Sequence, residues 1–175
     1  MAVNIVTGMT GTAHITSDDD RAMNASLFGT GKYVLEYGSQ FDATVLTNNQ
    51  IRIHDGMCIN QGTQMGIELN DYEDLVIENG VSGSKRNDLI VMRYERNADT
   101  SIEKASLVVI KGTAGATATD PSYTSGNILD GGELIDDMPL FRVKIESLSI
   151  TAVEPLFEVI ENEFISSSDI DSLFV

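Results

Sequence analysis

Carboxylates are the most abundant groups in this chain that could do chemistry, and two runs of them stand out. Asp18, Asp19 and Asp20 form one run, and Asp136 and Asp137 form another. Their oxygens suit Ca²⁺, but neither run has the spacing, the glycine and the terminal glutamate of an EF-hand loop. Capping of a helix explains the first run more economically. A carboxylate pair for glycoside hydrolysis stays open, because counting 27 acidic residues cannot identify one.

The other reactive groups are few, and their spacing matches no known site. His14 and His54 are not paired at a zinc-binding spacing, and Cys58 is the single cysteine, so a zinc site would need ligands from distant strands. Cys58 is expected to act as a small apolar side chain in the core. The pair Gly29 and Gly31 lacks the third glycine of a dinucleotide fingerprint, and the motif Gly-x-Ser-x-Gly does not occur. We therefore predict no catalytic, metal-binding or cofactor-binding residue and no enzyme.

Composition and charge narrow the classes of partner. A chain of 175 residues fits one domain with its own hydrophobic core. Its 27 acidic and 11 basic residues give a net charge of −16, which repels nucleic acid and anionic lipid. We therefore expect neither a nucleic-acid nor a membrane partner. One cysteine fits folding in a reducing cytoplasm, and we read no secretory signal and no apolar run of about 20 residues.

One short helix is predicted near the N-terminus. Ser17 has the character of an N-cap, and Asp20 follows at the spacing of a capping box. The acidic run suits the positive end of a helix dipole. Gly29 would end the helix in the left-handed conformation.

Downstream, short runs of strand-forming residues alternate with turn residues such as Gly38-Ser39, Asn48-Asn49 and Asp55-Gly56. Many short strands with frequent turns are typical of antiparallel sandwiches and barrels. The predicted fold class is therefore all-β, an antiparallel β-sandwich or partly open barrel with one short N-terminal helix. The predicted strands are 32–36, 41–47, 50–54, 57–60, 64–69, 74–78, 88–95, 105–111, 140–146 and 150–156.

Three segments allow finer predictions. In 140–146, apolar and charged residues alternate, which indicates a strand with one buried and one solvated face. The continuous apolar run 107–110 predicts a central strand covered on both faces, by a second sheet or by a neighbouring subunit. The long polar connection 112–138 is expected to meet a neighbour and to order in an assembly.

The alternating pattern ends near residue 157, so we predict a β domain over 1–157 and a tail over 158–175. If Ser168 caps a final turn, Ile170, Leu173 and Phe174 lie on one side of it. These three residues are our candidates for docking to a partner. The alternative is that the tail folds back on its own sandwich or frays.

Four blocks of sequence carry a family resemblance: 87–94 (NDLIVMRY), 107–113 (LVVIKGT), 120–124 (DPSYT) and 139–145 (PLFRVKI). In this order they resemble tail and baseplate structural proteins of bacteriophages that infect Gram-positive bacteria. That family is close to the anchoring portion of receptor-binding fibres. The resemblance extends upstream through 12–17, 31–35 and 53–56, so it covers nearly all of 1–157.

The resemblance implies a non-enzymatic virion protein of the distal tail or baseplate, assembled in the cytoplasm of the bacterial host. It would act as an adaptor or as the attachment domain of a receptor-binding apparatus. Its partners would be copies of itself, with a trimer favoured, and other tail and baseplate proteins. Two alternatives stay open: a secreted carbohydrate-binding module and a tail-associated polysaccharide-degrading enzyme. The first should show surface aromatic residues, and the second a cleft with paired carboxylates.

Overall fold

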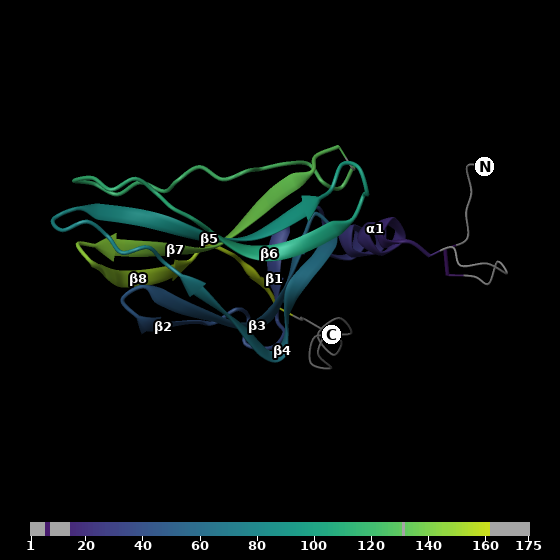
Figure 1. The fold of residues 1–175 in the computed structure, drawn as a ribbon. Helices are drawn as coiled ribbons and strands as arrows, with labels where there is room; N and C mark the ends of the chain where they lie inside the picture. Colours follow the sequence, from purple (N-terminus) through teal and green to yellow (C-terminus); the bar gives the residue numbers. More distant parts are fainter. Residues whose placement is uncertain (1–5, 8–14, 131, 162–175) are drawn as a thin grey trace, which may run out of the picture.

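The chain folds as an all-β sandwich with one short helix in the computed structural model, which describes residues 6–7, 15–130 and 132–161. Two sheets form the layers, and the helix lies at one end of them (Figure 1). This confirms the predicted fold class. The elements are α1 Ser17–Phe28, β1 Lys32–Leu35, β2 Ala43–Thr47, β3 Gln50–Asn60, β4 Thr63–Val76, β5 Lys85–Arg96, β6 Glu103–Ile110, β7 Ile135–Glu146, β8 Ser149–Pro155 and β9 Val159–Ile160.

Sheet 1 has five strands and sheet 2 has four. Sheet 1 has the order β2-β3-β1-β9, and β4 pairs with β3; sheet 2 has the order β6-β5-β7-β8. All described pairings are antiparallel except that of β1 with β9, which is parallel. Because β9 pairs with β1, sheet 1 continues past residue 157, where the sequence placed the end of the domain.

The hydrophobic core lies between the two sheets. Sheet 1 contributes side chains such as Val34 and Ile53, and sheet 2 contributes Ile90 and Val143. From Phe141 to Glu146 in β7 the apolar residues are buried and the charged residues between them are half-buried or exposed, which confirms the alternation read from 140–146. The two sheets therefore hold each other by their apolar faces.

The N-cap of helix α1 lies one residue before the predicted one. Thr16 is the N-cap and Asp19 closes the capping box, so the assignment of these roles to Ser17 and Asp20 is wrong. Both residue types can cap, and the register depends on which side chain reaches the backbone N–H groups. Gly29 ends the helix with φ 79° and ψ −175°, so it uses a positive φ but not the left-handed helical conformation expected for it.

Asp55-Gly56 does not form a turn, as the sequence had suggested. It is a bulge inside β3, which runs unbroken from Gln50 to Asn60. Asp55 is buried, and its carboxylate accepts a hydrogen bond from Ser39 Oγ at 2.7 Å. That bond lowers the pKa of Asp55. The carboxylate therefore fastens the 38–41 turn onto the bulge. Strands 64–69 and 74–78 likewise merge into β4, which bends at Asn70 with φ 65°.

The inner strands of sheet 2 are β5 and β7, and β6 lies at the edge, so the prediction of a central strand at 107–110 is wrong. In β5, Ile90 and Met92 point into the core between the sheets. Leu89 and Val91, which alternate with them, point to the outer face and are also buried. Something other than sheet 1 must therefore cover the outer face of sheet 2.

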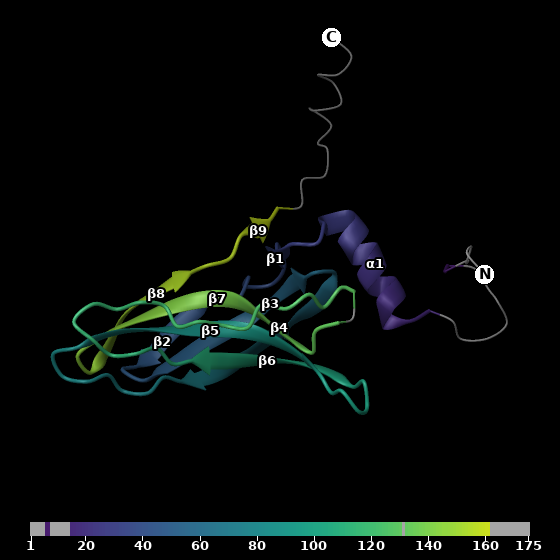
Figure 2. The same ribbon diagram turned by 90° about the horizontal axis from the view of Figure 1, so that it is seen from above.

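The segment 112–130 supplies that cover (Figure 1). It runs along the outer face of β5 and β7, and the view from above shows it over these strands (Figure 2). Near its end, the side chain of Ile128 joins the core. The expectation that this connection orders in an assembly is corrected: it is the third layer of its own domain. Residues 135–138 of the predicted connection belong to β7. Ile170, Leu173 and Phe174 lie outside the described residues.

The close approach of this third layer to β5 can be tested by substitution of Gly112. A Cβ placed on Gly112 would lie 2.0 Å from the backbone oxygen of Asn87, whereas one on Gly132 would meet nothing within 4 Å. Gly112→Ala must therefore push the segment off β5, and we expect it to lower the free energy of unfolding by about 2 kcal/mol. Gly132→Ala is the matched control and should leave stability nearly unchanged. Urea unfolding followed by circular dichroism measures both, and equal stabilities would contradict the packing.

Candidate functional site

Four aspartates connect the 112–130 segment to the sandwich, and we call them the carboxylate anchors: Asp88, Asp120, Asp136 and Asp137. Asp88, Asp136 and Asp137 each accept a hydrogen bond from a backbone N–H of the segment. Asp120 belongs to the segment itself and binds side chains of the sheet. Each anchor also forms an ion pair with a basic side chain of a strand. These contacts make the anchors the densest polar cluster of the described chain.

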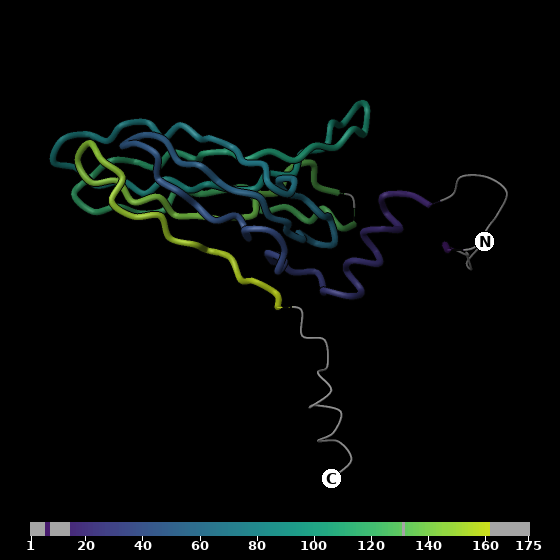
Figure 3. The backbone as a smooth tube through the Cα atoms, turned by 90° about the horizontal axis from the view of Figure 1, so that it is seen from below, coloured from purple at the N-terminus to yellow at the C-terminus, as the bar shows by residue number. Residues whose placement is uncertain are grey.

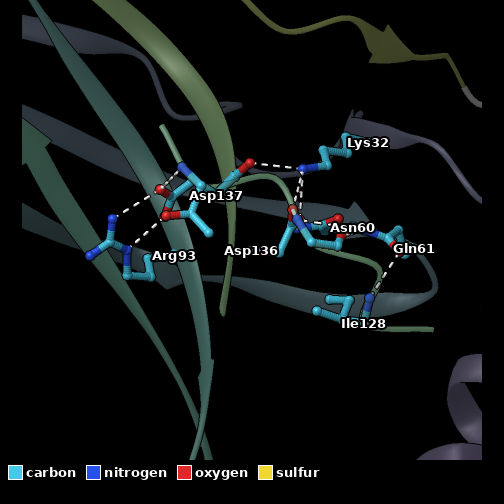
Figure 4. Close-up of polar contacts among 9 residues, drawn as sticks. Lys32, Asn60, Gln61, Arg93, Ile128, Asp136 and Asp137 are labelled. Atoms are coloured by element: carbon cyan, nitrogen blue, oxygen red, sulfur yellow. Dashed lines mark hydrogen bonds and ion pairs between the residues drawn. The ribbon is translucent and has the colours of Figure 1, made fainter. Parts of the chain in front are cut away.

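Asp136 joins both sheets and the segment (Figure 4). Its carboxylate is fully buried and lies 2.6 Å from Nζ of Lys32 on β1. It also accepts hydrogen bonds from Nδ2 of Asn60 on β3 at 2.6 Å and from the N–H of Gly126 at 2.7 Å. Lys32 Nζ donates to the backbone oxygen of Asp137 as well, at 2.8 Å. One cation therefore links β1 of sheet 1 to two consecutive residues of β7.

Asp137 points to the opposite face of β7, as the alternation of a strand requires. Its oxygens pair with Nε and Nη2 of Arg93 at 2.6 and 2.9 Å, and Oδ2 accepts the N–H of Thr124 at 2.9 Å. The backbone N–H of Asp137 in turn donates to the oxygen of Thr124 at 2.9 Å. The residue is therefore bound on all sides by β5 and by the covering segment (Figure 4).

The remaining two anchors hold the first part of the segment. Asp88 forms a two-point pair with Arg86, through distances of 2.8 and 2.9 Å, and accepts the N–H of Gly112 at 2.9 Å. Asp120 accepts Nε of Arg142 at 2.7 Å and Nδ2 of Asn87 at 2.8 Å. The hydrogen bond from Arg142 lowers the pKa of Asp120, and the same bond raises the pKa of Arg142.

This geometry decides what Asp136 and Asp137 do chemically. Glycoside hydrolysis needs two carboxylates that face one cleft with a sugar between them. Asp136 and Asp137 are neighbours in sequence but face opposite sides of a sheet, and both are fully buried against cations. They are suited to hold the fold together and not to protonate a substrate. The same engagement makes them unsuitable as Ca²⁺ ligands.

A second polar cluster attaches α1. Arg21 of α1 forms an ion pair with Glu103 of β6, and the hydroxyl of Tyr94 donates to Glu103 at 2.6 Å. The Arg21 guanidinium also lies 5.7 Å from the centre of the Tyr94 ring. Burial and the bond to Glu103 raise the pKa of Tyr94 to about 12. The helix is thus attached to sheet 2 by charge and hydrogen bonds.

One cavity beside this cluster holds two carboxylates, Asp20 and Glu103, and has a volume of about 470 Å³. Burial raises the pKa of Glu103, but hydrogen bonds from Tyr94 and Arg21 outweigh it, so the pKa lies below its ordinary value. A general acid in a glycosidase needs a raised pKa. Glu103 is therefore not suited to act as the general acid of such an enzyme.

The candidate metal and thiol residues are not brought together. Cys58 is buried, burial raises its pKa to about 12, and its thiol donates to the oxygen of Met65. This confirms its expected place in the core. His54 contacts Thr44 on the surface of sheet 1 at 3.2 Å, and His14 lies outside the described residues. No three His, Cys, Asp or Glu side chains of the described chain are grouped to hold a metal ion.

Sequence reasoning found Asp136 and Asp137 but missed their partners, Lys32 and Arg93. The small number of basic residues in the chain is the signal that could have found these two partners. Of the eleven in the chain, ten form ion pairs in the described structure, and the eleventh, Arg96, contacts Ser101. A cation inside an apolar strand of so acidic a chain indicates a carboxylate close by in space.

Comparison with known proteins adds no family assignment. No protein-family model matches the chain, and no curated protein matches it significantly. Within the described ranges no helix is long and apolar enough to cross a membrane.

The anchors should differ sharply from surface ion pairs in their effect on stability. Asp136→Asn leaves Lys32 facing an uncharged amide in a buried site, and we expect a loss of about 3 kcal/mol in the free energy of unfolding. Glu95→Gln removes a pair with Lys104, whose side chain is 68% exposed, and should cost less than about 1 kcal/mol. Urea titration of both variants makes the comparison. A similar small loss for both would contradict the role of Asp136.

The lowered pKa of Asp120 predicts how the stability of the fold depends on pH. Because the pKa of Asp120 is lower in the folded chain than its unfolded value of about 3.9, the unfolded state binds more protons in acid. Its contribution is therefore present above about pH 4 and is lost as the pH falls through the folded-state pKa. Asp120→Asn should make unfolding free energy less dependent on pH between about pH 5 and pH 3. Asp130→Asn in the same segment, which removes a contact with Asn127, serves as the control. An unchanged slope in Asp120→Asn would refute the assignment.

Proposed function

We propose that this protein is a non-enzymatic structural protein of the distal tail or baseplate of a bacteriophage, acting as an adaptor or attachment domain of the receptor-binding apparatus. One observation carries the proposal. The four sequence blocks that resemble tail and baseplate proteins meet in one place, which is the three adjacent strands β6, β5 and β7 of sheet 2 and the segment that covers them. They are the β5, β6 and β7 parts of that sheet and the 120–124 part of the segment.

Two of the four carboxylate anchors, Asp88 and Asp120, lie within these same blocks. Gly112 bonds to Asp88 and Arg142 bonds to Asp120. Asn87, in the same block as Asp88, donates to Asp120, so these hydrogen bonds join all four blocks. The resemblance therefore falls on residues that build a rigid three-layered body. Such a body suits a protein whose work is to hold others in position. It supports a structural role over the two alternatives, a carbohydrate-binding module and a polysaccharide-degrading enzyme.

The arrangement of the first and last described elements supports an attachment role. Phe28 at the end of α1 and Ile160 in β9 line the same cavity, of about 350 Å³, beside β1. Both elements therefore meet the sandwich in one region, and the hairpins at its other end are left for other contacts (Figure 1). The proposal includes self-association, with a trimer favoured, in which edge strand β6 offers the half-buried side chains of Val108 and Ile110.

Labelling of particles tests the proposal. Antibodies against the purified protein, with gold detection in electron microscopy, should mark the distal end of the tail in phage particles from a lysate of the strain that carries the gene. The same protein should release no reducing ends from host cell-wall or capsular polysaccharide. Particles without label, label on the capsid, or release of reducing ends that a single carboxylate substitution abolishes would each refute the proposal.

The predicted docking peptide is tested in the same particles. Deletion of residues 166–175 should weaken incorporation and leave the melting temperature nearly unchanged, because a short helix is ordered only in a groove of a partner. Replacing Ile170, Leu173 and Phe174 with Ser should have the same effect. Replacing Asp169 and Asp171 with Asn is the control and should leave incorporation intact. A large loss of melting temperature with normal incorporation would place the tail in the core instead.

A further inference from the structure

Helix α1 turns a polar face toward the sandwich. Arg21 is 8% exposed and binds Glu103. One turn further along, Nδ2 of Asn24 donates to the backbone oxygen of Gly62 at 2.9 Å. Gly62 lets the helix approach closely, since a Cβ there would lie 2.5 Å from the oxygen of Arg21. The helix is thus held by polar contacts at a fixed distance.

The outward side of α1 carries two exposed apolar side chains, and the first of them, Met23, lies at its edge, where it also lines the cavity that contains Asp20 and Glu103. Met23 is 55% exposed and Leu27 is 68% exposed. Residues four apart lie on one face of a helix, so these two side chains form a ridge. Arg21, Asn24 and Phe28 lie on the other side, by the same geometry. A surface helix ordinarily buries its apolar stripe and exposes its charges. In α1 the buried residue is Arg21, and the described residues leave Met23 and Leu27 largely uncovered, although apolar surface favours cover.

The ridge lies in an acidic surface. The first turn of α1 carries Asp18, Asp19 and Asp20, and its last turn carries no basic residue. The one cation of the helix, Arg21, is turned inward. The helix also projects at one end of the sandwich, and no other described helix or strand lies over its outward side (Figures 2 and 3).

We propose that this outer face of α1, formed by Met23 and Leu27 with Asp20 beside them, is a docking surface for a partner segment that carries bulky apolar side chains flanked by Lys or Arg. Charge complementarity selects this occupant. A second copy of the chain would bring the same aspartates and a net charge of −16, so like charges would face each other. An amphipathic helix with a basic rim meets both features at once. The inference rests on the proposed function only where it takes the partner to be another tail protein.

Three fluorescent peptides of about 18 residues, or five helical turns, test the surface against the full-length protein. The first has Leu on one helical face, flanked by Lys. The second has the same composition in scrambled order, and the third has Glu in place of Lys. Fluorescence anisotropy at physiological salt should show the first peptide binding at least about tenfold more tightly than the other two. Equal binding of the scrambled peptide would mean general attraction to an acidic protein, and equal binding of the Glu peptide would mean apolar contact alone; either result overturns the proposal.

Substitutions then locate the site. Leu27→Ser and Met23→Ser should each weaken the first peptide by about tenfold, because each removes a buried apolar side chain from the complex. Ile102→Ser is the matched control, since Ile102 has the same 68% exposure in a hairpin distant in sequence, and it should change nothing. All three residues are exposed, so folding should survive, which circular dichroism verifies.

Two outcomes would overturn the location or the occupant. Unchanged affinity in both ridge variants would place the peptide elsewhere. Sedimentation that shows the native protein as an oligomer and Leu27→Ser as a monomer would make a second copy the occupant. Neither outcome depends on phage particles, so failure here is distinguishable from failure of the proposed function.

Discussion

The neutralisation of Asp136 and Asp137 is the constraint on which the rest of the structure depends. Two adjacent carboxylates enter the buried start of β7, and a strand must turn them to opposite faces. A buried carboxylate is tolerated only when it is paired and hydrogen-bonded. Asp136 therefore requires Lys32 of sheet 1, and Asp137 requires Arg93 of β5. Both also require N–H groups of the 112–130 segment, so one dipeptide fixes two sheets and a covering layer in register.

A second constraint follows from the small number of cations. With 27 acidic and 11 basic residues, a chain that places ten cations in ion pairs leaves few positive groups for other tasks. The internal pairs fix architecture, and the surface that remains is acidic. This division explains why α1 is attached by Arg21 rather than by its apolar residues. Arg21 forms an ion pair with Glu103 and lies over the ring of Tyr94, and Tyr94 also donates a hydrogen bond to Glu103, so these polar contacts hold α1 against sheet 2.

The sequence predicted well where one local rule decides the outcome. Alternation in β7 and turn residues at Asn48-Asn49 followed from local pattern alone. Prediction from the sequence failed where contacts between distant parts of the chain decide the local structure. Asp55-Gly56 has turn chemistry, but pairing with β4 on both sides of it, at His54 and at Gly56, draws it into a continuous strand as a bulge. The apolar run 107–110 resembles a central strand, yet the strand that is buried on both faces is β5, because the covering segment supplies the second face.

The covering segment shows why the site itself was only half predicted. Its composition of Gly, Ala, Thr and Ser is that of a mobile connection, since no apolar pattern marks it as a layer. What orders it is the set of N–H groups that meet carboxylates far away in sequence, and such pairs leave no local pattern. Ile128 alone inserts into the core from this segment. The same logic applies to α1, whose orientation is fixed by Arg21 and Asn24 through directional bonds. Because directional bonds specify position without consuming apolar surface, they leave Met23 and Leu27 for a contact outside the domain.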